Sequence, residues 1–403
     1  MKKINLKELR TANHRVIRDI NELIVLNIVR EQEPVARVKI AEIAGFEPGT
    51  VTRILQQFLR KKLVYEAGLG ASTPAGGRRP RYVHLNPAAC CAIGVDIGAV
   101  EAVLALSDLR GELQSVKRIR NTKSPEQTLA SVAEEISSLV HSSKAYRELG
   151  GIGVSLIGLI DVEQGTILEG ENLGWPEPVE VGKILRSKIK DIPLFFENGA
   201  RLAAMGEIWF GGPHLSGIRD LVFVDINEGV GAGIILNGQL YRGFRNGAGE
   251  FGHVCVDPSG PTCSCGSNGC LEVFASDLAT VRRYVQRARI SDDSAIDVKL
   301  IVELANKGDA IAIEALKETA RYLGLGLAPI IYSLAPEVMV IGGKLVSAWS
   351  LIEKEVWASC AERVSQPFLH NTKILPSTLR ARASLMGAIA LVLAKNFAAP
   401  ELF

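Results

Sequence analysis

The sequence has no long hydrophobic run, because the longest, from Leu323 to Leu334, is shorter than the roughly 20 residues that a membrane-spanning helix needs. The basic N-terminal segment is not followed by the apolar stretch of a secretory signal, so we expect a cytoplasmic protein with no membrane partner. Cysteine is scarce as well, with seven residues in 403. Such an odd number argues against a disulfide framework and for free thiols or a metal site.

Charge is unevenly distributed along the chain. Residues 1–84 contain 16 Lys and Arg against 8 Asp and Glu, a formal charge of +8, and because the whole chain carries +2, the remainder carries −6. A basic nucleic-acid module joined to an acidic ligand-binding body has this pattern. Chance fluctuation over a segment of this size gives the same asymmetry, so charge alone leaves both interpretations open. The length itself predicts two or three domains, since single cores stop growing beyond about 250–300 residues.

Residues 1–86 predict a winged helix-turn-helix domain. Apolar residues at helical spacing indicate three helices, namely Arg15–Arg30, Arg37–Ala44 and one that begins at Pro48. A helix, a short helix, a turn and a further helix form the helix-turn-helix arrangement. Two predicted strands, Lys62–Ala67 and Arg81–Asn86, add a hairpin that serves as the wing.

The exposed face of the third helix and the wing supply the candidate DNA contacts. These are Arg37, Thr50, Thr52, Arg53, Gln57, Arg78, Arg79 and Arg81. Hydroxyl, amide and guanidinium groups suit phosphate oxygens and base edges, and a slender Gly-Gly-Arg-Arg-Pro segment can enter a narrow minor groove. Each feature alone also fits an ordinary solvated helix face or a basic linker. Together they favour double-stranded DNA as the partner.

The rest of the chain, residues 87–403, predicts an α/β fold with two similar halves. Strands at Ala92–Gly98, Val100–Leu106 and Gly111–Val116 form a meander, and a helix over Pro125–Arg147 and a strand over Gly151–Leu156 follow. The pattern recurs at Asp220–Ile226, Gly229–Gly238 and Gln239–Gly243, with helices at Leu278–Arg289, Val298–Lys307 and Asp309–Ser333. Two such lobes around a cleft are typical of actin-like sugar kinases, in which hairpin turns hold nucleotide phosphates. A glycine-rich hairpin alone is equally an ordinary turn.

One histidine and three cysteines predict a structural zinc site. His253 is followed after nine residues by Cys263, Cys265 and Cys270, and an imidazole with three thiolates supplies the four ligands of a closed tetrahedral site. A group of free thiols is the alternative. The remaining cysteines, Cys90, Cys91, Cys255 and Cys360, are predicted to lie in the core.

The chain resembles the ROK (repressor, open reading frame, kinase) family, above all its sugar-responsive transcriptional repressors. The resemblance is carried by Gly229–Gly238, by Gly-Ala-Gly-Glu-Phe-Gly-His at 247–253, and by the Cys-x-Cys-Gly-x-x-Gly-Cys-x-Glu run that ends at Glu272. It implies an actin-like two-lobed sugar-sensing domain over residues 87–403 with a zinc loop over residues 253–270. It also implies a sugar site made of Asn198, Glu250, His253 and Glu272. The implied partners are operator DNA, a sugar effector and a second copy of the chain in a homodimer or larger homo-oligomer.

Departures from the kinase pattern predict a protein that is not an enzyme. Family kinases have Asn-Asp where this chain has Asn198-Gly199, so the catalytic base is missing. Acids also stand in the two phosphate turns, at Glu101 and Glu228, although Ile341-Gly-Gly of the adenosine side is retained. A sugar kinase that phosphorylates hexoses with ATP is the alternative. A third possibility is a regulator sequestered by a sugar-transport phosphocarrier protein.

Overall fold

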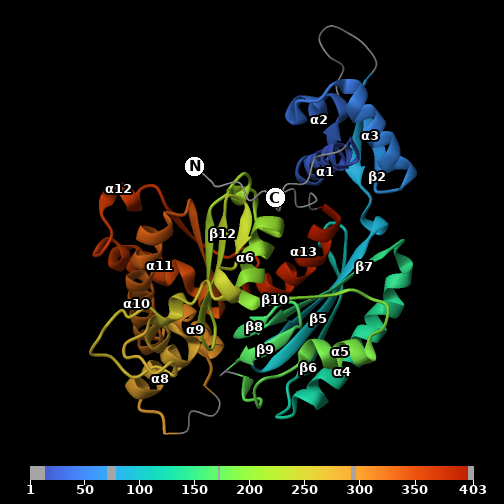
Figure 1. The fold of residues 1–403 in the computed structure, drawn as a ribbon. Coiled ribbons are helices and arrows are strands. Elements are labelled where there is room, and N and C mark those ends of the chain that lie inside the picture. The colour runs from blue at the N-terminus through green and yellow to red at the C-terminus, as the bar shows by residue number, and fades with distance from the viewer. Residues whose placement is uncertain (1–13, 70–78, 171–172, 292–295, 398–403) are drawn as a thin grey trace.

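The computed structural model describes residues 14–69, 79–170, 173–291 and 296–397. Figure 1 shows a small head, coloured blue, above a body of two lobes, with α6 (Gly199–Phe210) and α13 (Ala383–Phe397) between the lobes. We call the described residues up to Leu85 the head and those from Pro87 onward the body. In the described part of the chain, no helix has both the length and the hydropathy needed to cross a bilayer.

The head contains the three predicted helices, α1 (His14–Gln32), α2 (Arg37–Ala44) and α3 (Pro48–Arg60). The left-handed backbone of Gly45 ends α2, and Pro48 opens α3 at the position where its missing N–H costs nothing. The two predicted wing strands are present as β2 (Val64–Leu69) and β3 (Arg81–Leu85). A two-residue strand that was not predicted, β1 (Val35–Ala36), pairs with β3 and completes a sheet of order β1-β3-β2. The winged helix-turn-helix order is therefore confirmed.

The first lobe is built on a five-stranded sheet of order β10-β7-β4-β5-β6. Its strands are β4 (Cys91–Ile97), β5 (Glu101–Asp108), β6 (Leu113–Arg120), β7 (Leu149–Leu156) and β10 (Leu194–Asn198). The first three form the predicted antiparallel meander, and β7 and β10 add in parallel. Helices α4 (Pro125–Ser142) and α5 (Val181–Lys188) and the small hairpin β8 (Leu159–Asp161)–β9 (Thr166–Glu169) complete the lobe. The prediction that α4 reaches Arg147 is wrong, because the chain tightens into a 3-10 turn after Ser142.

The second lobe repeats this design. Its sheet has the order β13-β12-β11-β14-β15, again with three antiparallel strands followed by two parallel ones. The strands are β11 (Leu221–Ile226), β12 (Val230–Leu236), β13 (Gln239–Tyr241), β14 (Val338–Gly343) and β15 (Lys373–Pro376). The helices are α7 (Leu271–Ala275), α8 (Asp277–Ala288), α9 (Val298–Asn306), α10 (Ala310–Leu334), α11 (Trp349–Ala361) and α12 (Gln366–Leu369). The predicted pair of similar lobes is therefore confirmed.

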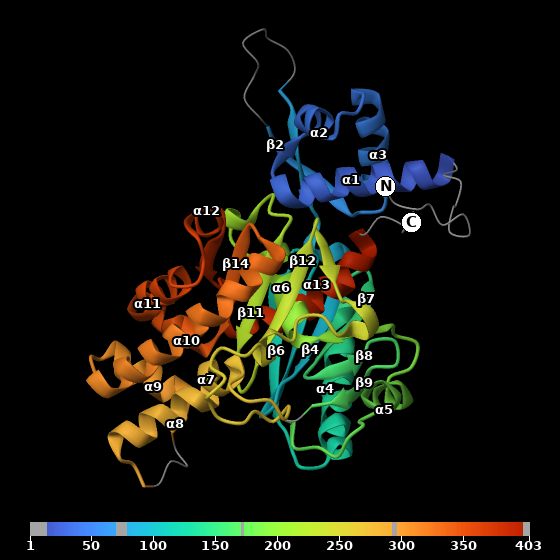
Figure 2. The ribbon, with the colours of Figure 1, turned by 60° about the vertical axis from the view of Figure 1, so that its left-hand side comes forward.

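Helices α6 (Gly199–Phe210) and α13 (Ala383–Phe397) pack against each other between the two sheets. Glycine permits this approach, since a Cβ at Gly387 would come within 1.8 Å of the Leu202 carbonyl oxygen. Above them, α1 of the head lies across the top of the body (Figure 2) and contacts α13. One buried hydrophobic cluster includes Val29 and Phe58 of the head as well as Val392 of the body. Head and body are therefore joined by a shared core.

Candidate functional site

The predicted DNA-contacting residues of the helices fall into two groups. Arg53 on α3 is exposed, and Thr50 and Thr52 are half-buried. Arg37 instead forms an ion pair with Glu66 of the wing, with 2.6 Å between Nη2 and Oε1, and Gln57 donates a 3.0 Å hydrogen bond to Glu22 of α1. These last two side chains thus fix α2 and α3 against the rest of the head.

The wing contributes exposed arginines beside the loop that joins its two strands. Arg79 and Arg81 are both exposed, and Arg81 opens β3. Arg78 lies outside the described residues. Within the wing, the ring of His84 on β3 stacks on that of Tyr65 on β2, with centroids 5.0 Å apart. The described guanidinium groups therefore extend from a paired and stacked hairpin rather than from an isolated linker.

The predicted zinc ligands converge on one point. The ligand atoms of His253, Cys263, Cys265 and Cys270 all lie within 4.8 Å of one another. The Sγ atoms of Cys265 and Cys270 are 3.7 Å apart, and Cys263 Sγ is 3.6 Å from Nδ1 of His253. All four come from loops around α7, held together by a backbone hydrogen bond from Leu271 to Val254.

These separations fit a tetrahedral zinc ion. With Zn–S bonds of about 2.3 Å and Zn–N bonds of about 2.0–2.1 Å, a tetrahedron has edges of about 3.8 Å between two sulfurs and about 3.6 Å between a sulfur and a nitrogen. A disulfide would instead bring two sulfurs to about 2.05 Å, and every cysteine of the chain is free. The donor set and its spacing therefore suit a closed metal centre, with the Nε2 atom of His253 left on the side away from the sulfurs.

Three of the other cysteines are buried as predicted, namely Cys90, Cys91 and Cys360. The prediction for Cys255 is wrong, because this thiol is exposed. Its neighbours in the sequence are valines, so the apolar context suggested burial. The segment around it, however, pairs with the metal-binding segment, which leaves Val256 buried in the core and Cys255 exposed.

The four candidate sugar residues gather around one end of β12. Asn198 caps the N-terminus of α6, accepting hydrogen bonds from Ala200 N (3.0 Å) and Arg201 N (3.3 Å). That end of α6 lies on β12, because a Cβ added at Gly231 would be 3.2 Å from the Ala200 side chain. At the start of β12, the Val230 N–H donates a 2.9 Å hydrogen bond to Glu272.

Glu250 and His253 reach the same end of β12 through the loop that carries them. Ala232 of β12 donates a 3.0 Å backbone hydrogen bond to the carbonyl of Gly249. A Cβ at Gly252 would come within 2.1 Å of the Val230 carbonyl oxygen, so this glycine lets the loop lie flat on the strand. Glu250 and His253 are both exposed, whereas Glu272 is half-buried. The segments that carry the four candidate residues therefore meet at one end of β12.

A buried ion-pair network supports this region, and sequence reasoning missed it. Glu197 is only 1% exposed, and its carboxylate contacts the guanidinium groups of Arg201 (3.0 Å) and Arg242 (2.6 Å). Arg201 also donates to the carbonyl of Asn246, in the loop that precedes Glu250. The partners of Glu197 are 4 and 45 residues away along the chain, and only folding brings the second one close.

The position after Asn198 carries no acid, as the sequence states. A Cβ at Gly199 would lie 3.2 Å from the hydroxyl oxygen of Ser155, which is 1% exposed. A side chain at this position would require the Ser155 hydroxyl to shift by a few tenths of an ångström. Asn198 itself is engaged on both sides, because its Nδ2 donates a 3.0 Å hydrogen bond to the Gly158 carbonyl.

Carboxylates gather around the second of the predicted phosphate-binding turns. Burial, followed by the charge of Asp96, raises the pKa of Asp225 to about 7, and burial raises the pKa of Asp277 to about 6. Lys344, which follows the retained Gly-Gly pair, lies 2.9 Å from Asp277 and 3.3 Å from Glu228. The sequence analysis did not identify Lys344. Its ammonium group supplies a positive charge beside Glu228 and Asp277 from within the protein, where a bound metal ion would otherwise be needed.

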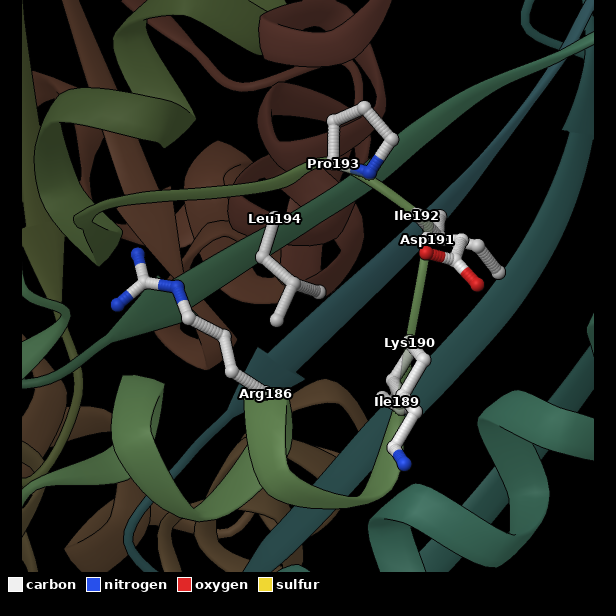
Figure 3. Close-up of a pocket in the computed structure, with 7 residues that line it drawn as sticks. All are labelled: Arg186, Ile189, Lys190, Asp191, Ile192, Pro193 and Leu194. Carbon is white, nitrogen blue, oxygen red and sulfur yellow. The ribbon is translucent and has the colours of Figure 1, made fainter.

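A hollow of about 530 Å³ opens elsewhere in the first lobe. It is lined by Arg186, Ile189, Lys190, Asp191, Ile192, Pro193 and Leu194 (Figure 3). Leu194 begins β10, whereas Asn198 ends it, so the hollow lies at the opposite end of this strand from the candidate sugar residues. The guanidinium group of Arg186 is hydrogen-bonded to the backbone carbonyls of Glu163 and Gln164. We therefore assign the hollow no role in that site.

The chain matches the family model described as "ROK family" over residues 92–395. It is 30% identical to the xylose repressor of Caldicellulosiruptor bescii, covering 97% of this chain and 99% of the relative. It is also 30% identical to the DNA-binding transcriptional dual regulator NagC of Escherichia coli (strain K12), covering 94% of each chain.

Two solved structures show the same fold. A ROK family transcriptional regulator, described as a homologue of the Escherichia coli MLC protein, matches with a TM-score of 0.77 and 25% identity, over 95% of this chain and 97% of that one. A ROK family glucokinase from Streptomyces griseus, in complex with glucose and AMPPNP, matches with a TM-score of 0.65 and 28% identity. The glucokinase is covered over 98% of its length by only 75% of this chain, so this chain has a segment that the kinase lacks.

Proposed function

This chain belongs to the ROK family, and from that premise we propose that it is a transcriptional repressor controlled by a sugar bound between its lobes. The observation that carries the proposal is the combination of a winged helix-turn-helix head with a two-lobed body whose candidate sugar residues share one end of β12. A relative named xylose repressor and one named DNA-binding transcriptional dual regulator each extend over nearly the whole chain, which supports the same conclusion.

The DNA-binding half of the proposal depends on the arginines of the head. Arg53 on α3 would reach the major groove, with Thr50 and Thr52 beside it, and Arg79 and Arg81 would follow the backbone or enter the minor groove. Arg37 and Gln57 would act indirectly, since their ion pair and hydrogen bond position the helices. A homodimer would place two heads on a palindromic operator.

The sugar-binding half depends on groups that both donate and accept hydrogen bonds. Vicinal hydroxyls would be oriented by the carboxylates of Glu250 and Glu272, the amide of Asn198 and the Nε2 atom of His253. The centre formed by His253 and the three cysteines would hold zinc, which would fix the loops bearing both glutamates. The ion pairs of the buried Glu197 would hold Asn198 and the segment before Glu250 in fixed positions relative to each other.

Helix α6 supplies a route from the sugar site to the head. Its N-terminus is capped by Asn198, and its 12 residues extend over about 18 Å to Trp209 near its C-terminus. Trp209 contacts Arg30 of α1, and the ion pair between Glu33 of the head and Arg110 of the body, 2.9 Å long, also links the two parts. A shift of α6 on sugar binding would therefore change the orientation of the head.

Phosphoryl transfer is not part of the proposed function. Gly199 provides no general base, and the acids Asp225, Asp277 and Glu228 would repel nucleotide phosphates, with Lys344 already engaged by two of them. The similarity to a glucokinase makes sugar kinase activity the second candidate. ATP turnover that depends on an added hexose would support that candidate and contradict ours.

Operator binding and sugar binding are tested together. A promoter-fragment gel shift is performed with and without xylose, N-acetylglucosamine and glucose, and each sugar is also tested by thermal shift. We expect one sugar to raise the melting temperature and to change operator affinity. A protein that binds operator but responds to no free sugar would instead fit sequestration by a phosphocarrier protein.

A further inference from the structure

The exposed Cys255 lies directly opposite the metal-ligand candidate Cys270 in an isolated antiparallel bridge. The hydrogen bonds that flank the pair, each 2.9 Å long, run from Leu271 N–H to Val254 O and from Val256 N–H to Gly269 O. Residues flanked in this way are not hydrogen-bonded to each other and form the closer type of antiparallel pair, with Cα atoms about 4.5 Å apart. Their side chains extend from the same face of the bridge.

We propose that Cys255 and Cys270 form a disulfide when the protein meets a hydroperoxide, and that this bond removes one ligand from the metal centre. A Cα separation of about 4.5 Å falls within the range of about 4.4–6.8 Å found across disulfides. The two thiols also differ in access, because Cys255 is exposed and Cys270 is 0% exposed. A hydroperoxide therefore reaches Cys255 first.

The chemistry proceeds in two steps. The sulfur of Cys255 attacks the peroxide O–O bond, so that Cys255 becomes a sulfenic acid and one equivalent of water or alcohol leaves. The sulfur of Cys270 then attacks the sulfenic sulfur, the S–O bond breaks, and hydroxide leaves and takes up the remaining proton as water. Two thiols have then lost two electrons to one hydroperoxide, and the disulfide has formed.

Loss of Cys270 as a ligand leaves His253, Cys263 and Cys265, one donor fewer than a closed tetrahedral site uses. Cys270 immediately precedes α7, whose first turn holds Glu272. The metal loss and any effect on sugar binding rest on the zinc and sugar sites of the proposed function, whereas the disulfide itself does not. The disulfide therefore stands or fails by itself.

The test uses the full-length, zinc-loaded protein and hydrogen peroxide, with Cys255→Ser as the matched variant. Cys255 is outside the four-residue cluster, so the variant is checked first for unchanged zinc content and melting temperature. Zinc release is followed with a chromogenic chelator. We expect one equivalent released from the unchanged protein and release about tenfold slower from the variant, because the exposed thiol that remains in the variant, Cys265, is itself a candidate metal ligand.

The position of the bond is read from a digest under non-reducing conditions. No Lys or Arg occurs between Arg245 and Arg282, so trypsin leaves all four thiols in one peptide. Cleavage before aspartate separates residues 225–256, which contain Cys255, from residues 257–276, which contain the other three cysteines. Peroxide should join these two fragments through Cys270, and a reductant should restore zinc binding. Equal rates of zinc release in both proteins, or a bond confined to residues 257–276, would overturn the proposal.

Discussion

The guanidinium carbon of Arg30 lies 4.0 Å from the centre of the Trp209 ring, so a residue of the head stacks on the end of the helix that Asn198 caps at its start. Burial at this contact lowers the pKa of Arg30, which is the expected response of a cation that has exchanged water for an aromatic face. The contact connects the two halves of the proposed function through one rigid element.

Replacing Trp209 with alanine should weaken communication between the sites more than it weakens either site. We expect the variant to bind operator and sugar separately. The factor by which sugar changes operator affinity should fall about fivefold or more, since coupling free energies of about 1–3 kcal/mol between two sites are typical. Fluorescence anisotropy with and without sugar measures this. Arg30→Lys is the companion variant, because it retains the charge but not the planar stacking group. Unchanged coupling in Trp209→Ala would exclude this route.

The wing arginine can be tested against an arginine of the body. Arg79→Ala should lower operator affinity and reduce the slope of log affinity against log salt concentration by about one, because one phosphate contact is lost. Arg186→Ala removes a guanidinium group from the first lobe and should leave operator affinity and its salt dependence unchanged. If both variants bind operator as the unchanged protein does, Arg79 does not contact DNA.

Removing the metal centre should affect the sugar site before it affects DNA binding. Cys263→Ala, or treatment with a chelator, should abolish the single bound zinc, lower the melting temperature by a few degrees and remove the thermal shift caused by sugar. Metal analysis and thermal denaturation provide the measurements. A variant that lacks zinc but retains the sugar response would show that the loops bearing Glu250 and Glu272 do not need the ion.

Restoring a carboxylate at position 199 should not create a kinase. Gly199→Asp returns an acid to the position after Asn198, but the carboxylates of Glu228 and Asp277 remain, engage Lys344 and still disfavour nucleotide binding. We expect no hexose-dependent ADP formation in a coupled assay. Turnover by this variant would show that the missing base is the only obstacle, and that the acids do not exclude ATP.

The acid cluster should make stability depend on pH. Because the pKa of Asp225 is raised to about 7, the folded state holds a proton that the unfolded state releases, and stability falls as the pH rises from about 4 to about 7. Asp225→Asn removes this penalty, so it should stabilise the protein by about 1–3 kcal/mol above pH 7 and by nearly nothing near pH 4. Thermal denaturation between pH 5 and pH 8 measures the difference. Glu163→Gln, at an exposed carboxylate, is the control and should show no such trend.

Local patterns predicted most of the fold, because helical spacing, glycine turns and Pro48 act within a few residues. The clustering of the four candidate metal ligands was predicted for the same reason, as they occupy one short segment. Contacts over long sequence separations were not predicted. Arg37 gives no local sign of its partner Glu66, and Lys344 gives none of Glu228, since only folding brings each pair together.

The error at Cys255 has a related cause. An apolar neighbourhood in the sequence predicts burial only where the segment joins a core strand or helix. Here the backbone of Val254 and Val256 pairs with the metal-binding segment, and the thiol of Cys255 between them is exposed. Side-chain direction in such a loop follows from its pairing partner, which the sequence does not reveal.

We propose above all that a sugar bound in the body changes the affinity of the head for operator DNA. The most direct test is the dissociation constant for a promoter fragment, measured at fixed salt with and without saturating sugar from a panel that includes xylose, N-acetylglucosamine and glucose. We predict that one sugar changes the constant by about tenfold or more, equivalent to about 1.4 kcal/mol of coupling, and that Glu250→Gln abolishes the change. If the dissociation constant for the promoter fragment is the same with every sugar that binds, the proposed control by sugar is wrong.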